Sequence, residues 1–414
     1  MKDYSFPILK IIAVGMLVLS ACAGPAWLTN TALLFVPALF FVQGYFFRTE
    51  YRDHERDYIK QKLRRIYVPF VGWSLLFILL HNVFYATGII GRTGMPEQGA
   101  YLPYDINEWC ERTWGICLGM TGFDRCLCEF YWVFRALLVS ALLFLGLNKL
   151  AGLLLPGKSD SIRVGSVALG CLGLLAWMTA CSLSVPIIPD GGYREIYATL
   201  LMSLGYLYRR HVAELQPRLV LSIASAGIVA LFACLWPSSL TESASLTSML
   251  CLLLPACAGF ILLHNISRVL AQQDNSLRRA LIYAGERWFY VLAFSLLACK
   301  LSGMVILLCK GLPWRALRQF PTLGGAEIGY GWTALHWLIG MSLPLLIVWG
   351  WNRLDRKYDL SPENCLRYTL TGIVITAKCL YRLIKRFGKA LWGGFIGFFT
   401  GLIDIVHASN PKDE

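Results

Sequence analysis

The residues of this sequence that could carry out chemistry lie mostly in apolar surroundings. Lys10 interrupts an apolar run near the start of the chain, and Arg135 lies among aromatic residues in FYWVFRALLV. His81 and His336 lie in similar apolar segments. A cation can hold an anionic substrate group, and an imidazole can accept a proton near neutral pH. We therefore take Lys10 and Arg135 as candidates for binding an anionic group, and His336 as a candidate base.

Each of these residues also has a structural explanation. A long cationic side chain can extend along apolar surface until its charge reaches water, which would account for Lys10 and Arg135. A lone buried histidine such as His81 or His336 is commonly a hydrogen-bonded residue of the core. The sequence leaves both explanations open at these positions.

Four cysteines lie close together in EWCERTWGICLGMTGFDRCLCEFYW: Cys110, Cys117, Cys126 and Cys128. In an oxidising compartment they would form two disulfides, with three alternative pairings. A zinc site is the weaker alternative, because the spacing is uneven and no histidine is nearby. Four free thiols are the remaining alternative. We expect disulfides among these residues and no metal.

The composition identifies the elements that must position these side chains. The chain is 57% hydrophobic and 15% charged, with a mean hydropathy of +0.56, whereas soluble domains carry about 25% charged residues. The apolar residues gather in ten blocks near membrane-spanning length, which must be helical because lipid offers the backbone no hydrogen bonds. The blocks are approximately 6–24, 31–47, 66–87, 130–150, 163–185, 195–208, 218–236, 246–266, 287–309 and 332–352. We therefore predict an all-α, polytopic integral membrane protein with about ten transmembrane helices.

Positive charges are distributed unevenly among the connections between these blocks. Seven Lys and Arg residues lie in 48–65 and ten lie beyond residue 352, whereas 25–30 and 237–245 carry none. This alternation predicts that both termini are cytoplasmic and that the protein is a multi-pass protein of the cytoplasmic (inner) membrane. The net charge of +13 then reflects positive charges gathered on the side of the membrane that faces the cytoplasm. The sequence contains no soluble basic face of the kind that would indicate nucleic-acid binding.

The stretch LVLSACAG contains Leu19-Ser20-Ala21-Cys22, which matches a lipoprotein cleavage signal. A cleaved signal peptide needs an uninterrupted apolar core after a short basic end. Lys10 divides the apolar stretch here. We therefore interpret residues 6–24 as the first transmembrane helix.

The composition changes once, near residue 355. We assign residues 1–372 to a ten-helix membrane domain and 373–414 to a basic cytoplasmic tail. The tail contains an apolar run, 391–406, that is short for a membrane span and is more typical of a helix lying in the interface. The alternative is a helix-pairing role, because Gly393, Gly397 and Gly401 are four residues apart.

Six segments share features with one known family of membrane proteins. They are FPILKIIAVGMLVLSA, VPALFFVQGYFF, YIKQKLRRIYVPFVGWSLLF, FYWVFRALL, LLMSLGYLYRRH and LDRKYDLSPENCLRYTLTG, and they cover residues 1 to about 372. Gln43-Gly44-Tyr45 is similar to an SGY-like tripeptide, and Lys62, Arg65 and Pro69 match a basic-to-proline start of the third helix. In this order the segments resemble the acyltransferase 3 family of bacterial integral-membrane proteins.

The resemblance implies transfer of an acyl group from a cytoplasmic donor, with acyl-CoA as co-substrate and no bound cofactor, onto a cell-envelope glycan or glycolipid. In the family, the basic residue of the first helix is followed eleven positions later by a histidine. The corresponding residues here are Lys10 and Ala21. A second histidine, in the ninth helix of many members, corresponds to Phe294. Neither Ala21 nor Phe294 can accept a proton, so the catalytic residue stays unidentified.

Three hypotheses follow from these departures. The first is an active membrane O-acyltransferase in which Lys10 and Arg135 bind the donor and another residue, such as His336, supplies the base. The second is a catalytically silent relative that binds or transports a glycan or lipid intermediate. The third, an unrelated ten-helix transporter, is disfavoured because the sequence has no internal symmetry. The sequence leaves the oligomeric state open.

Overall fold

A computed structural model describes residues 3–91, 102–185, 188–212, 219–240, 245–325 and 328–358. Within these ranges all of the regular secondary structure is helical, which confirms the predicted all-α fold. The chain divides into two units, Met1–Leu346 and Ile347–Glu414, and the contacts described below lie within the first. The predicted division at residue 372 and the predicted tail, 373–414, lie outside the described residues.

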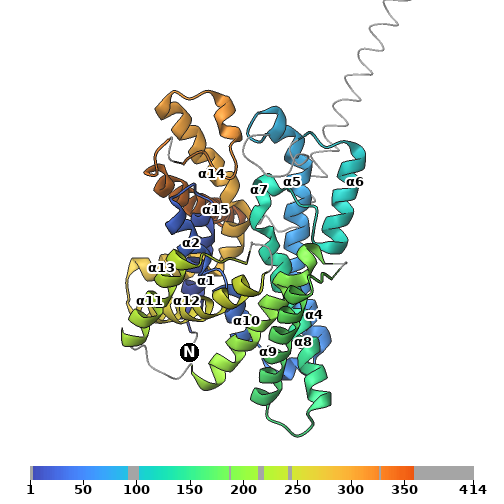
Figure 1. Ribbon diagram of the computed structural model, residues 1–414. Coiled ribbons are helices and arrows are strands. Elements are labelled where there is room, and N and C mark those ends of the chain that lie inside the picture. The colour runs from blue at the N-terminus through green and yellow to red at the C-terminus, as the bar shows by residue number, and fades with distance from the viewer. Residues whose placement is uncertain are drawn as a thin grey trace, which may run out of the picture. The chain divides into compact units, whose positions relative to one another are not determined.

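Figure 1 shows the helices in chain order by colour. The main helices are α1 (Ser5–Ser20), α2 (Ala26–Leu33), α3 (Ala38–Tyr45), α4 (Glu55–Lys62), α5 (Val68–Ala86), α8 (Trp132–Leu154), α9 (Asp160–Ala180), α10 (Tyr193–His211), α11 (Leu219–Leu235), α12 (Leu246–Gln272), α13 (Ser276–Glu286), α14 (Trp288–Lys310) and α15 (Trp332–Tyr358). Each of the ten apolar blocks overlaps a described helix, and the block 31–47 is divided between α2 and α3, whereas α4 and α13 lie between blocks. Among the described residues, 7 helical segments are long and apolar enough to cross a membrane. The protein is therefore a multi-pass membrane protein, while the count of ten helices and the side of each terminus stay predictions.

Helix α1 forms the centre of the packing. It contacts α2, α3, α12, α13 and α14, and most of its side chains are buried. On an ordinary surface helix the apolar side chains form one stripe, whereas a helix that is apolar all round is buried on all sides. The sequence of α1, SFPILKIIAVGMLVLS, is of the second kind, with Lys10 as its one charged residue. Helix α10 packs against α3, α8 and α9.

Helices α3 and α10 cross with their backbones in contact. A Cβ atom added at Gly44 would lie 1.9 Å from the carbonyl oxygen of Met202, and one added at Gly205 would lie 2.1 Å from that of Phe41. No side chain larger than hydrogen fits at either position. The two glycines belong to the QGY and LGY segments, so the crossing explains why both segments contain a glycine.

The segment after α5 folds back along that helix. Helix α6 (Ile106–Trp114) continues into a π-helical turn, η3 (Gly115–Gly119). Near one end of α5, Asn82 exchanges hydrogen bonds of 3.0 and 2.7 Å with the backbone of Tyr104. Before the other end, the Tyr67 hydroxyl donates to the carbonyl of Cys117. The connection between the third and fourth apolar blocks is thus partly helical and lies beside α5.

Candidate functional site

Three cationic side chains gather near the start of α1. Lys10 lies within electrostatic reach of Lys62, the last residue of α4, and of Arg65 in the π-helical turn η2 (Leu63–Tyr67). We call these three residues the basic cluster. No carboxylate of the described residues forms an ion pair with any of them. Because like charges repel, this arrangement is unfavourable until an anion occupies it.

Aromatic rings surround the basic cluster on the side of α3. The Lys10 ammonium lies 5.8 Å from the centroid of the Phe46 ring, which is 48% exposed. Phe46 contacts Phe6 of α1 at a ring separation of 4.7 Å, and Phe6 contacts Tyr45 at 4.3 Å. The guanidinium of Arg209, near the end of α10, lies 5.8 Å over the Tyr45 ring. Cations and half-exposed aromatic faces therefore alternate at this end of α1.

A histidine that the sequence analysis did not single out lies against the same rings. His264 of α12 is 2% exposed, and its ring centroid is 5.1 Å from that of Phe6 and 6.2 Å from that of Tyr45. Its Nδ1 atom lies 2.9 Å from the hydroxyl oxygen of Tyr208 on α10. Tyr45 and Phe46 follow the α3–α10 crossing directly, so the two glycines hold this aromatic group in place.

Arg135 lies in a different electrostatic environment from Lys10. It is 4% exposed on α8, and its Nε atom is 2.8 Å from Oε1 of Glu195, which is fully buried on α10. A buried guanidinium is stable when a carboxylate balances its charge. The snorkelling explanation therefore does not hold for Arg135, because its partner lies inside the protein. Its predicted role in donor binding stays a prediction.

The other end of α1 is covered by the loop after α14. We call residues 312–325 the capping loop; its described turn η6 spans Trp314–Arg318. The Thr322 hydroxyl donates to the Ala21 carbonyl at 2.9 Å, and Ala21 is 8% exposed. Lys300, a buried lysine within α14, donates to the carbonyls of Leu317 and Gln319 at 3.1 and 2.6 Å. The position expected to hold the family's first histidine is thus closed by loop and helix.

His336 of α15 also holds the capping loop. It is fully buried, and its Nε2 atom lies 2.6 Å from the Leu323 carbonyl, so Nε2 must carry a proton. The Ser302 hydroxyl lies 2.5 Å from Nδ1. Both ring nitrogens are occupied, so this geometry offers no nitrogen to a substrate hydroxyl. The role of His336 as a base stays a prediction, and the contacts describe a structural residue.

Phe294, at the second expected histidine position, lies among aromatic rings. Its ring centroid is 4.8 Å from that of Trp73 and 5.7 Å from that of Phe77, both on α5. The assignment of Ala21 and Phe294 to the family's histidine positions stays a prediction.

A comparison of the sequence with profiles of known protein families identifies the family of this chain. The sequence profile of a family described as an acyltransferase domain, acyltransferase 3, matches residues 3–350. The chain belongs to the acyltransferase 3 family. Neither a curated protein nor a solved structure shows a significant match to the chain. The matched range includes both ends of α1 and every candidate residue considered so far.

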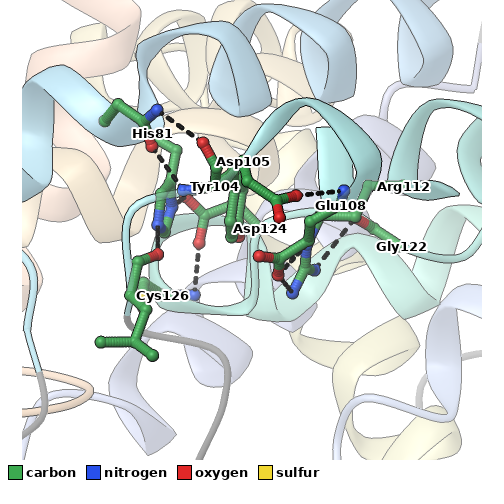
Figure 2. Close-up of polar contacts among 10 residues, drawn as sticks. His81, Tyr104, Asp105, Glu108, Arg112, Gly122, Asp124 and Cys126 are labelled. Carbon is green, nitrogen blue, oxygen red and sulfur yellow. Dashed lines mark hydrogen bonds and ion pairs between the residues drawn. The ribbon is translucent and has the colours of Figure 1, made fainter. Parts of the chain in front are cut away.

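This acyltransferase 3 protein contains a second buried histidine with both nitrogens engaged (Figure 2). His81, on α5, lies 2.8 Å from Asp124 through Nδ1 and 3.1 Å from the Leu102 carbonyl through Nε2. The Tyr104 ring stacks on the imidazole at 3.6 Å, and the Arg112 guanidinium lies 4.3 Å from the Tyr104 ring centroid. Since Nε2 faces a carbonyl, it carries a proton and cannot accept one. The pair anchors the segment beside α5.

The four cysteines of that segment differ in how far they are exposed to solvent. Cys126 and Cys128 are buried, Cys117 is half-buried and Cys110 is exposed. Their predicted disulfides stay a prediction. Within the described ranges no group of three or more His, Cys, Asp or Glu side chains is arranged to hold a metal ion.

Proposed function

We propose that this acyltransferase 3 protein transfers an acyl group from a cytoplasmic thioester donor of the acyl-CoA class onto a hydroxyl of a cell-envelope glycan. The proposal places the protein in the cytoplasmic membrane, with the basic cluster facing the donor. The observation that carries it is the group formed by Lys10, Lys62 and Arg65, which has no carboxylate partner among the described residues. A donor of this class carries phosphates, whose charge would remove the repulsion among the three cations.

The aromatic rings beside the basic cluster support the same assignment. Phe46 is half exposed next to Lys10, and a flat apolar face of this kind can pack against the uncharged part of such a donor. Arg209, over Tyr45, adds a further cation. In the reaction the acceptor oxygen bonds to the acyl carbon, the carbon–sulfur bond breaks, and the acceptor's proton ends on the thiolate.

A second function is favoured by the other end of α1. Ala21 cannot act as a base, and both nitrogens of His336 are occupied. We therefore keep the alternative of a catalytically silent protein that binds or transports a glycan or lipid intermediate. On that alternative the basic cluster would hold the phosphate of such an intermediate.

The two functions are separated by comparing envelope glycans and glycolipids, by mass, between a deletion strain and strains that express wild type or Lys10→Ala. Loss of an acyl mass on deletion, restored by wild type and not by Lys10→Ala, supports transfer. Unchanged acylation with accumulation of a glycan or lipid intermediate contradicts transfer and supports the alternative. The exposed Lys158→Ala variant is the matched control, and it should restore the wild-type pattern.

A further inference from the structure

The described histidines differ in how many ring nitrogens are engaged. His81 and His336 are buried with both nitrogens engaged, and His54 and His211 are exposed. His264 is buried, and only its Nδ1 atom has a hydrogen-bond partner among the described residues. Among the buried histidines of the described residues, His264 is therefore the one whose second ring nitrogen can still bind a ligand.

The position of His264 connects it to the basic cluster through two rings. Its imidazole contacts Phe6 at 5.1 Å between centroids, Phe6 contacts Phe46 at 4.7 Å, and Phe46 lies under the Lys10 ammonium at 5.8 Å. Tyr45 and Tyr208, which also border the imidazole, are half-buried. The free nitrogen thus belongs to the same end of α1 as the proposed donor site.

The environment of His264 is apolar on one side and hydrogen-bonded on the other. Its ring is 2% exposed and lies against Phe6, and its Nδ1 atom pairs with the Tyr208 hydroxyl. When the Nδ1 proton is donated to the Tyr208 oxygen, the Nε2 lone pair is free to accept a proton.

We propose that His264 is the catalytic base of the acyl transfer, in place of the histidines absent at Ala21 and Phe294. This inference rests on the proposed function. The acceptor hydroxyl gives its proton to Nε2 of His264 while its oxygen bonds to the acyl carbon of the thioester. The carbon–sulfur bond breaks, and the proton on Nε2 passes to the leaving thiolate. Tyr208 is a positioning residue, because its hydroxyl fixes which nitrogen carries the resting proton.

The proposal gives a reason for the buried imidazole beside the cations. A base contributes about 10²–10⁴-fold when it lies at the reacting atoms in the correct protonation state. A purely structural histidine would instead serve to support Tyr208, and its removal would weaken the packing of α10 against α12.

The test uses the full-length protein in lipid nanodiscs, with coenzyme A itself as the binding probe, together with glycan acylation in complemented deletion strains. For His264→Gln we expect coenzyme A affinity within about two-fold of wild type and unchanged thermal unfolding, but acylation lower by about 100-fold or more. Tyr208→Phe should bind coenzyme A normally and lower acylation by about ten-fold, since it leaves the imidazole in place.

The matched control is His81→Gln, which removes a buried histidine whose nitrogens are both engaged, by Asp124 and by the Leu102 carbonyl. It should lower thermal stability and leave acylation per folded molecule near the wild-type value. The proposal is overturned if His264→Gln keeps acylation within about ten-fold of wild type, or if it loses acylation only in proportion to folded protein. If deleting the gene leaves the acyl groups of the envelope glycans unchanged, the proposed function itself fails. That outcome differs from a failure of His264 alone, in which deletion removes an acyl group but His264→Gln does not.

Discussion

The two ends of helix α1 present opposite electrostatic arrangements. At the Lys10 end, three cations face one another without a carboxylate partner in the described residues, and one nitrogen of His264 is unpaired. At the Ala21 end, Lys300 donates to two carbonyls and His336 uses both ring nitrogens. Polar groups are present at both ends, so their presence alone does not identify a site.

The difference teaches which polar groups to assign to ligand binding. Buried polar groups that complete one another's hydrogen bonds stabilise the fold. Cations held together without a counterion destabilise it, and persist where a ligand supplies the missing charge. By this criterion we propose that the Lys10 end binds substrate, whereas the Ala21 end holds the capping loop on α1, α14 and α15.

The largest effect on folding is expected from Gly44→Ala, which would disrupt the α3–α10 crossing that supports the Lys10 end of α1. The new Cβ would lie 1.9 Å from the Met202 carbonyl oxygen, and a backbone contact of this kind cannot be relieved by a side-chain movement. Folded protein should become undetectable by size-exclusion chromatography in detergent. Gly170→Ala on α9 is the control, because its Cβ meets no atom within 4 Å, and it should be neutral or stabilising by about 0.5–1 kcal/mol.

Lys300→Met should destabilise the Ala21 end without affecting ligand binding. The change leaves the Leu317 and Gln319 carbonyls without their donor, so we expect a loss of about 2–4 kcal/mol in unfolding free energy. Thermal unfolding in detergent measures the effect, and Lys310→Met, at the exposed end of α14, is the control. Weaker coenzyme A binding at unchanged stability would reverse our assignment of the two ends.

Lys10→Ala should have the complementary result. Removing one cation relieves repulsion within the basic cluster, so stability should be unchanged or higher. Coenzyme A affinity should fall about 10–100-fold, which corresponds to one charge-assisted contact. Titration calorimetry at low and high salt checks both the loss and its electrostatic origin. Equal affinity for wild type and Lys10→Ala would remove the Lys10 end as the donor site.

His336→Gln should give the smallest change. Glutamine can restore one of the two hydrogen bonds that the imidazole makes with Leu323 and Ser302, so about 1–2 kcal/mol of unfolding free energy should be lost. Thermal unfolding in detergent measures this loss of stability. A variant that folds as well as wild type but lacks acylation would make His336 the base and contradict our comparison.

The fold was predictable because its signal is local. Apolar blocks near membrane-spanning length with few charges specify helices, and each of the ten blocks overlaps a described helix. The pairing of Arg135 with Glu195 was not predictable, because the two residues are 60 positions apart and nothing in either segment indicates the other.

The site was predictable in part. Lys10 stood out as a charge in an apolar helix, and Lys300 in LLACKLSG carried the same signal, which the sequence analysis did not use. His264 could not be separated from a core histidine, because its meaning depends on Tyr208, 56 positions away, and on the rings of α1 and α3. The sequence singled out His336 only because it is a histidine in an apolar segment, and a structural histidine of the core gives the same signal.

The crossing of α3 and α10 has a mechanical consequence. Where side chains separate two helices, the helices can slide by changing rotamers, but glycine crossings at Gly44 and Gly205 leave nothing between the backbones to rearrange. We therefore expect the two helices to move as one rigid body. Because α10 carries Glu195 near its start and Tyr208 near its end, a displacement of Tyr45 at one end of this body should be transmitted to the Arg135 ion pair at the other.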